Sequence, residues 1–147
     1  MSQVAGRLVL AAAVCLAAGS IGANVWAHGD VTPQAVDTSA LPDIGEAWLT
    51  KNPYRDDPKV YAAAQKIGQS AYGGNCARCH GLEGISGGIA PDLRYLDAGE
   101  AGDEWSLERY RPGSSRDGKV YMPPMGDTLG QKAGWAIRSW LDSKHEG

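Results

Sequence analysis

The sequence contains no phenylalanine, and it holds only three cysteines and three methionines among its 147 residues. Glycine, by contrast, is abundant, with 20 residues. This composition predicts a large share of loop and a thin hydrophobic core with few large apolar side chains. Such a core gains stability when it packs around a prosthetic group.

Positive charge is also in short supply, since 14 lysines and arginines stand against 17 aspartates and glutamates, a formal net charge of −3. No cluster of cations indicates a nucleic-acid-binding surface, so we expect no nucleic acid partner. The sequence has no internal repeat and no alternating pattern typical of a β-strand. Its apolar stripes have helical spacing, which predicts a mainly α-helical fold.

Residues 1–27 have the features of a signal peptide. Arg7 gives a positive N-terminal region, residues 8–18 are apolar, and the segment VWA places small residues at positions −3 and −1 of a cleavage site after Ala27. The apolar run is shorter than the roughly 20 residues that span a bilayer, so we predict cleavage, with an uncleaved anchor as the alternative. Cys15 belongs to this segment and acts there as a small apolar residue. Cleavage removes Arg7 and leaves 13 cations against 17 carboxylates, a net charge of −4.

The remaining chain is predicted to comprise an extended arm, residues 28–57, and a domain, residues 58–147. The arm is rich in proline and aspartate, with a possible helical turn at 45–49 that seats Trp48. Asp57-Pro58 has the pattern of a helix N-cap followed by proline, and the apolar stripe that follows ends at Gly73-Gly74.

Two further helices are expected, a short one from Asp103 and a last one over residues 129–141, while residues 114–120 are predicted to be a polar loop. The last helix lacks a good N-cap at Gly130, and Gly134 in its interior costs about 1 kcal/mol relative to alanine.

The segment GNCARCHG, residues 74–81, has a spacing that three kinds of site use. A zinc site would need a second pair of ligands, which residues 28–147 do not offer at similar spacing. A thioredoxin-like dithiol would follow a strand, whereas a helix is predicted before Cys76. Covalent haem attachment fits: Cys76 and Cys79 add to the two haem vinyl groups, and His80 binds the iron. A chance occurrence of this motif has a probability of roughly one in a thousand.

Electron-transfer haems usually complete the iron coordination with methionine or histidine. After the initiator, the only methionines are Met122 and Met125, which share one loop with two stiffening prolines. The other candidates, His28 and His145, lie near the chain ends.

At these residues the chain resembles the small class I c-type cytochromes, from about residue 60 to residue 141. The motifs that carry the resemblance are GQSAYGGNCARCHG, APDL, YMPPMGDTL and WAIRSWL. The resemblance implies the class I cytochrome c fold, in which short helices and loops wrap around one covalent haem c. It also implies that Met122 is the axial ligand opposite His80, that Met125 is a packing residue, and that the Pro91 carbonyl accepts a hydrogen bond from His80.

Four further positions match that family. Gly68 and Tyr72 lie eight and four residues before the first cysteine, and Leu129 and Trp140 follow the methionine loop at the family's spacing. In the family, the glycine leaves a notch at which the last helix crosses the first, and we expect Trp140 to cross there.

More narrowly, the segments HGDVTPQAVDT, NPYR and GGIAPDLRYL are similar to the periplasmic cytochromes associated with quinoprotein alcohol dehydrogenases, which use pyrroloquinoline quinone (PQQ). This resemblance implies a one-electron carrier rather than an enzyme. It would accept electrons from a PQQ-dependent alcohol dehydrogenase and pass them to a terminal oxidase or another cytochrome. The alternatives are a haem protein with an open sixth site that acts as a peroxidase or binds gases, and a fixed haem subunit of a larger dehydrogenase complex.

Overall fold

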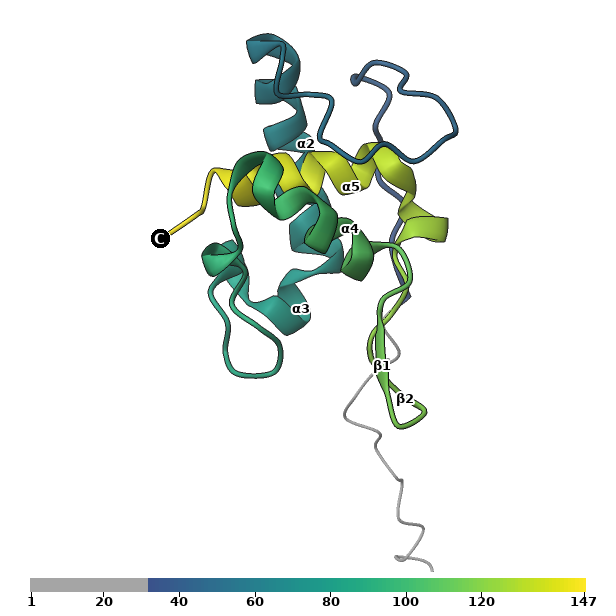
Figure 1. The fold of residues 1–147 in the computed structure, drawn as a ribbon, viewed down its shortest axis with the longest axis vertical. Coiled ribbons are helices and arrows are strands. Elements are labelled where there is room, and N and C mark those ends of the chain that lie inside the picture. Colours follow the sequence, from purple (N-terminus) through teal and green to yellow (C-terminus); the bar gives the residue numbers. More distant parts are fainter. Residues whose placement is uncertain (1–31) are drawn as a thin grey trace, which may run out of the picture. The chain divides into compact units, whose positions relative to one another are not determined.

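Two long helices, α2 (Pro58–Asn75) and α5 (Gly126–Asp142), cross at the centre of the fold (Figure 1). The structure is a computed structural model and describes residues 32–147, so the predicted signal peptide, Cys15 and His28 lie outside the described residues. At the crossing, a Cβ atom added to Gly68 would meet the carbonyl oxygen of Ala136. Ala136 therefore occupies the notch where we expected Trp140. Trp140 lies one turn further along α5, against the ring of Tyr72, with ring centroids 4.4 Å apart.

Helix α2 begins as predicted but ends later. The Asp57 carboxylate caps it by accepting from the backbone N–H groups of Lys59 and Val60 at 2.8 and 3.2 Å. The prediction that Gly73-Gly74 stops the helix is wrong, because α2 continues to Asn75. The Asn75 side chain bonds to both backbone groups of Gln34 in the arm, and this tertiary contact outweighs the poor helix propensity of the glycines.

Short elements connect the two long helices. They are helix α3 (Ala77–His80), the 3₁₀ turns η1 (Leu82–Gly84), η2 (Leu93–Tyr95) and η3 (Gly99–Gly102), helix α4 (Asp103–Tyr110), and strands β1 (Ser114–Arg116) and β2 (Lys119–Met122). None of the helices within residues 32–147 is long and apolar enough to cross a membrane.

The two strands form an antiparallel hairpin where a polar loop was predicted. Asp117 and Gly118 make its turn with φ values of 52° and 74°. An Asp-Gly pair with two positive φ angles is typical of the tight turns whose twist suits a β-hairpin. The prediction missed it because the flanking residues do not alternate between apolar and polar.

The arm packs along α5 rather than forming a helical turn at 45–49. The amide of Gln131 donates to the carbonyls of Gly45 and Ala47 at 2.6 and 2.9 Å, so the predicted helical turn is absent and these carbonyls bind α5 instead. Trp48 lies near the ring of Tyr110, with ring centroids 6.2 Å apart. Leu41 and Tyr54 are buried against α2 and α5.

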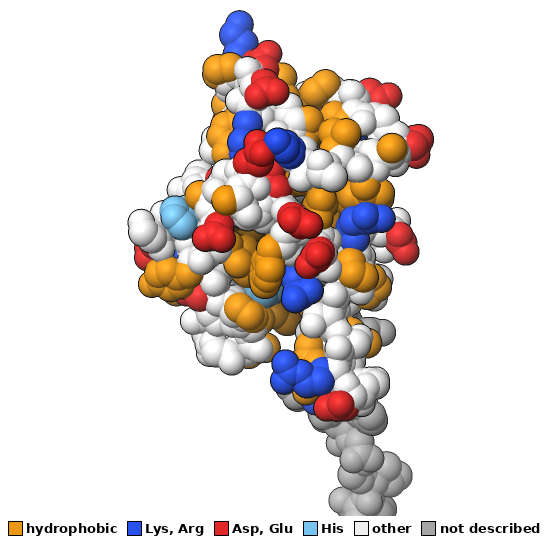
Figure 2. Space-filling model, in the orientation of Figure 1, with side chains coloured by type: hydrophobic (Ala, Val, Ile, Leu, Met, Phe, Trp, Pro, Cys, Tyr) orange, Lys and Arg blue, Asp and Glu red, His pale blue; other side chains and the backbone are white. Residues whose placement is uncertain are grey.

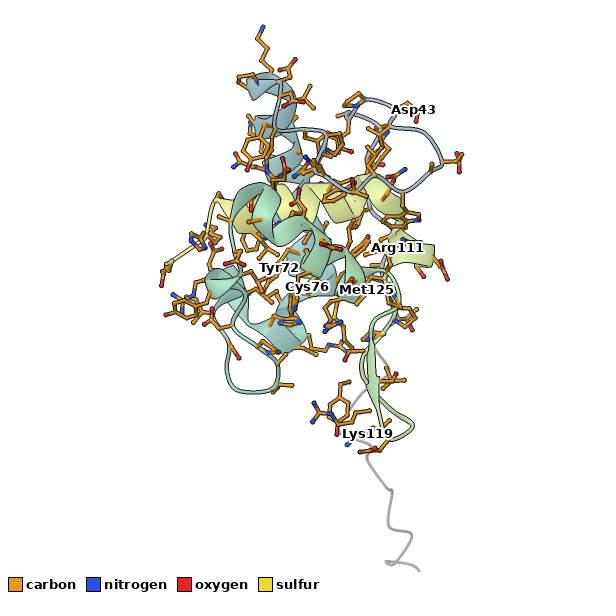
Figure 3. All side chains as sticks on the ribbon, in the orientation of Figure 1. Asp43, Tyr72, Cys76, Arg111, Lys119 and Met125 are labelled. Atoms are coloured by element: carbon orange, nitrogen blue, oxygen red, sulfur yellow. The ribbon has the colours of Figure 1, made fainter. Side chains whose placement is uncertain are left out.

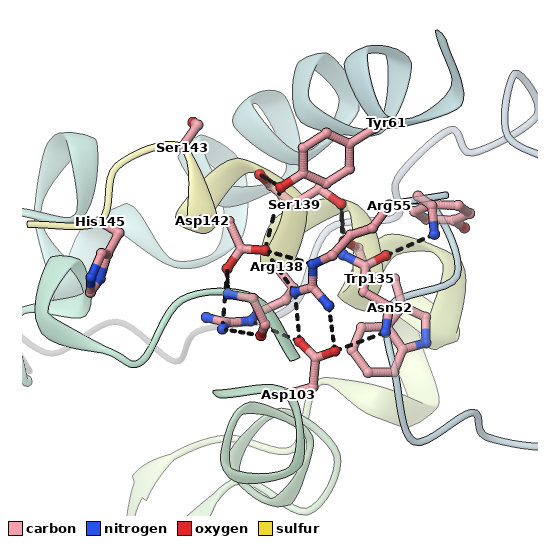
Figure 4. A network of polar contacts seen from close by, with 12 residues as sticks. Asn52, Arg55, Tyr61, Asp103, Trp135, Arg138, Ser139, Asp142, Ser143 and His145 are labelled. Carbon is pink, nitrogen blue, oxygen red and sulfur yellow. Dashed lines mark hydrogen bonds and ion pairs between the residues drawn. The ribbon is translucent and has the colours of Figure 1, made fainter. Parts of the chain in front are cut away.

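A buried polar network holds the arm, α4 and α5 together (Figure 4). Asp103, the first residue of α4, is 1% exposed and binds the guanidinium groups of Arg55 from the arm and Arg138 from α5. Both arginines also pair with Asp142 near the end of α5. Asn52 completes the network through Asp103 and Ser139.

Gly134, expected to weaken the last helix, has a packing role. A Cβ atom on it would lie 2.7 Å from the ring of Tyr110, so only glycine lets α4 and α5 approach this closely. Helix α5 also contains a break at Gly130, whose φ of 73° and ψ of 172° are not helical. Gly130 therefore separates the first turn of α5 from its long segment, and its carbonyl accepts from the Tyr110 hydroxyl at 2.9 Å.

Candidate functional site

The two cysteines of the CARCH segment lie on one helical turn. Helix α3 starts directly after α2, and the Cys76 carbonyl accepts from the N–H groups of Cys79 and His80 at 3.1 and 3.0 Å. Residues three apart on a helical turn point to the same side, so the two thiols face a common region. Both thiols are free and half-buried. The structure thus brings Cys76, Cys79 and His80 together.

The orientation of His80 is fixed by the chain beyond it. Its Nδ1 lies 2.8 Å from the Pro91 carbonyl oxygen, which is the hydrogen bond that the resemblance implies. A carbonyl can only accept, so in the neutral ring Nδ1 carries the proton and Nε2 has the free lone pair. This is the tautomer of a metal-binding histidine, and the carbonyl makes the ring a better electron donor.

The Pro91 carbonyl is held in place by a cross-linked loop. Ser86 donates through its hydroxyl to the Ala90 carbonyl, and its N–H donates to the Asp92 carboxylate at 3.1 Å. Arg94 pairs with Asp92 at 2.9 Å and lowers the pKa of that carboxyl. The loop starts at Gly81, where φ is 77° and a Cβ atom would collide with the Ile85 carbonyl. These contacts hold the Pro91 carbonyl in place beside His80.

Burial shapes the chemistry of the groups beneath the motif. It raises the pKa of the Cys76 thiol to about 12, so this thiol is neutral near pH 7. It also raises the pKa of Tyr72, whose hydroxyl donates to the Gly81 carbonyl at 2.8 Å. Neither the Cys76 thiol nor the Tyr72 hydroxyl is therefore charged near pH 7.

The two methionines occupy different positions. Met125 is 4% exposed and belongs to the core cluster that also contains Tyr72 and against which Cys76 packs; all three are labelled in Figure 3. Its backbone N–H donates to the Tyr110 carbonyl at 3.0 Å. Met122 is half-buried and packs against the same core cluster as Cys76. Only Met122 combines this contact with access to the surface.

The strand register of the hairpin is irregular immediately before Met122. Ser114 pairs with Met122, but Ser115 pairs with Val120, so Tyr121 has no partner on the opposite strand. This extra residue is a β-bulge, a device that turns the following side chain and often occurs beside functional sites.

The residues around the motif fit a flat apolar group. Cys76, Leu93 and Met122 are half-buried and line the core cluster. Ile85, Ile89 and Val120, from the adjoining loop and hairpin, are 50%, 79% and 59% exposed. Apolar side chains that are half-buried or exposed beside the motif are suited to an apolar cofactor. Within residues 32–147, no three His, Cys, Asp or Glu side chains cluster as a metal site.

Comparison with known proteins gives the family. A family described as "Cytochrome C oxidase, cbb3-type, subunit III" matches residues 63–141. Cytochrome c550 of Pseudomonas aeruginosa is 55% identical over 137 residues, which cover 93% of this chain and 94% of that protein. The chain belongs to the class I c-type cytochromes. It is a cytochrome c550-like electron carrier with the mostly helical fold of that family.

Two weaker relatives of this cytochrome are dehydrogenases. Quinohemoprotein alcohol dehydrogenase ADH-IIG of Pseudomonas putida is 43% identical over 49 residues, 30% of this chain and 7% of that enzyme. The dehydrogenase subunit of the quinone-dependent alcohol dehydrogenase of Gluconobacter oxydans is 38% identical over 72 residues, 48% of this chain and 9% of that subunit. No solved structure matches the cytochrome.

The sequence did not reveal the residues that support the methionine loop. Tyr110 binds the Met125 N–H and the Gly130 carbonyl, and its ring fills the notch at Gly134. The signal available in the sequence was Gly134, a glycine inside a predicted helix. His145, a ligand candidate from the sequence, lies at the C-terminal end with Nδ1 2.9 Å from the Leu96 carbonyl oxygen.

Proposed function

We propose that this cytochrome is a periplasmic protein with one covalent haem c, exported with a signal peptide that is cleaved after Ala27. Cys76 and Cys79 form the thioether bonds, and His80 Nε2 and the Met122 sulfur are the axial ligands of the iron. The observation that carries the proposal is the His80–Pro91 hydrogen bond of 2.8 Å next to the two free thiols. It leaves Nε2 free to bind iron.

Each residue has a separate role. The haem supplies a one-electron Fe³⁺/Fe²⁺ couple. The Pro91 carbonyl holds the proton on His80 Nδ1 and keeps the ring from rotating. Met122 supplies a soft thioether, which favours the ferrous state. The bulge before Met122 and the two prolines after it limit the movement of that sulfur.

We further propose that the electron donor is a PQQ-dependent alcohol dehydrogenase and that the acceptor is a terminal oxidase or another cytochrome. The named dehydrogenases that match parts of this chain support the choice of donor. A carrier role, rather than catalysis, follows if Met122 fills the sixth position, because substrate then has no site on the iron.

Covalent attachment is tested by denaturing electrophoresis of the exported protein. The wild-type band should retain haem-dependent peroxidase staining, and the double variant Cys76→Ala/Cys79→Ala should lose it. Haem that extracts from the wild type into acidified organic solvent would contradict the proposal.

The donor is tested by stopped-flow mixing of the oxidised cytochrome with a purified PQQ-dependent alcohol dehydrogenase and its alcohol. We expect ferrous haem to form at a rate that rises with the dehydrogenase concentration. If ascorbate reduces the cytochrome fully but the dehydrogenase does not, the proposed donor is refuted and the carrier function stands.

A further inference from the structure

Positive charge on the described chain is concentrated in one segment. Residues 109–122 carry four cations and one carboxylate, whereas the rest of residues 32–147 carries nine cations and fifteen carboxylates. The segment thus has a net charge of +3 on a protein that is otherwise strongly acidic. In Figure 2, blue side chains lie over the hairpin beside a red carboxylate, while the helical part above it carries both red and blue side chains.

The cations of this segment are also available. Elsewhere, five basic side chains pair with carboxylates: Lys51, Arg55, Arg94, Arg138 and Lys144. Within residues 32–147, no carboxylate pairs with any of the four cations of the segment, all of which are exposed: Arg109, Arg111, Arg116 and Lys119. Unpaired cations that remain solvated lose little when they form a salt bridge with a partner.

Two of these cations share one face of the hairpin with an exposed aromatic ring. Arg116 and Lys119 are directly opposite each other in the strand register, so their side chains lie on the same face. The Lys119 ammonium is 5.4 Å from the centroid of the Tyr121 ring, and Tyr121 is 62% exposed. We call Arg116, Lys119 and Tyr121 the hairpin face. Arginine and tyrosine are the residue types that most often dominate binding energy at protein interfaces.

The hairpin face lies directly beside the proposed iron ligand. Tyr121 is the bulged residue that precedes Met122, and Lys119 opens the same strand. A protein bound to this face would therefore come close to the iron along a short segment of one strand. Electron carriers benefit from weak, fast, electrostatically steered contacts of this kind.

We infer that the hairpin face is the docking surface for an acidic surface on the electron-transfer partner of this cytochrome. The inference rests on the proposed function. An anionic membrane is a poorer fit, because stable binding to lipid takes a cluster of about four to eight basic residues, whereas the hairpin face offers two. The reaction across the docked surface moves one electron and no proton: reduced partner and ferric cytochrome give oxidised partner and ferrous cytochrome.

The test compares two variants that change the net charge equally. Arg116→Glu/Lys119→Glu reverses the hairpin face, and Lys59→Glu/Lys66→Glu reverses two exposed lysines on α2. The visible spectrum of both should match the wild type, because neither touches the proposed ligands. Measurements at about 0.1 M ionic strength suit the comparison, because the Debye length is then about 10 Å and distant charges are screened.

Charged small-molecule reagents report the electrostatic potential at the site of electron transfer, and they need no protein partner. Ferricyanide should oxidise the ferrous wild type at a rate that falls with added salt, although the protein is net negative, and a cobalt(III) tris-phenanthroline cation should show the opposite trend. The hairpin variant should react with ferricyanide about fivefold more slowly and reverse the salt dependence, and the α2 variant should change less than twofold. Equal effects of the two variants would overturn the inference.

Binding is read separately by nuclear magnetic resonance with hexacyanochromate(III), a paramagnetic anion that exchanges no electron with the protein. Backbone signals of residues 114–121 should broaden in the wild type and in the α2 variant but not in the hairpin variant. Broadening centred on another surface would also overturn the inference.

The last measurement uses the dehydrogenase of the proposed function and vesicles of equal parts phosphatidylcholine and phosphatidylglycerol. Reduction by the dehydrogenase should slow by about the same factor in the hairpin variant and stay unchanged in the α2 variant. A wild type that the dehydrogenase does not reduce would refute the proposed donor, while the charged reagents still decide about the hairpin face. Vesicle binding that requires Arg116 and Lys119, without any effect on protein partners, would assign the face to a membrane and refute the docking role.

Discussion

Replacement of Asp103 by alanine tests the buried ionic network that joins the arm, α4 and α5. The carboxylate accepts four hydrogen bonds: from the Asn52 N–H at 2.9 Å, from Arg55 at 2.6 and 2.8 Å, and from Arg138 at 3.2 Å. Without it, the Asn52 N–H loses its side-chain acceptor, and Arg138, which is 2% exposed, loses one of its two anionic partners. Breaking a buried ion pair from one side costs about 3–5 kcal/mol. Since Asp142 remains beside both arginines, we expect a loss at the lower end, about 3 kcal/mol.

The dependence on pH has a definite sign. Burial alone would raise the pKa of Asp103, but hydrogen bonds and charge from Arg55 and Arg138 outweigh it and hold that pKa below its usual value of 3.8. The folded-state pKa is thus lower than the unfolded one. The contribution of Asp103 to the free energy of unfolding is complete above the unfolded pKa and is lost as the pH falls through the folded pKa. The difference between wild type and variant should therefore shrink below about pH 4.

Urea unfolding followed by circular dichroism at pH 7 and pH 3 measures both effects. The control is Glu100→Ala, which removes the exposed pair with Lys51, whose side chains are both 64% exposed. That change should cost less than about 1 kcal/mol at either pH. If Asp103→Ala and Glu100→Ala cost the same at pH 7, the network contributes no more than a surface ion pair and the reasoning fails.

Three other changes test the proposed site and the helix crossing. Met122→Ala should lose the weak far-red band of sulfur bound to ferric haem and lower the reduction potential of the haem. Met125→Ala should keep the band and lose about 2–5 kcal/mol of stability. Loss of the band in Met125→Ala alone would show that Met125, and not Met122, is the ligand. Gly68→Ala should destabilise by at least about 1–3 kcal/mol in urea unfolding, because its Cβ has no space beside the α5 backbone, and a neutral result would contradict the crossing. Tyr72→Phe removes the 2.8 Å hydrogen bond to the Gly81 carbonyl and should cost about 1 kcal/mol by the same assay; an unchanged midpoint would show that water replaces the hydroxyl.

The sequence predicted those features that depend on local chemistry. Asp57 caps α2 because a carboxylate beside proline is suited to that position wherever the rest of the chain goes. The hydrogen bond from His80 to the Pro91 carbonyl was expected from the family resemblance, and the class I cytochrome fold is confirmed by the comparisons. The assignment of Met122 as the iron ligand stays a prediction.

The errors arose where distant residues decide the local structure. Helix α2 passes through Gly73-Gly74 because Asn75 binds the arm, and no sequence window around the glycines contains that partner. Residues 45–49 form no helical turn because Gln131, far along the chain, binds the carbonyls of Gly45 and Ala47. Gly134 was predicted to weaken its helix, but the ring of Tyr110 packs against it and leaves no space for a Cβ atom.

The crossing of α2 and α5 also determines when the chain can fold. Gly68 and Ala136 meet across nearly half of the sequence, and closing a loop of that length costs on the order of 4 kcal/mol in chain entropy. Since α5 follows α2 in the chain, its contacts with α2 cannot form before the chain has been synthesised through α5. Cys76 and Cys79 precede α5 in the chain, so both thiols are synthesised before that crossing can close. If haem is attached through these thiols as proposed, the order of the elements allows the attachment to begin before α5 packs onto α2.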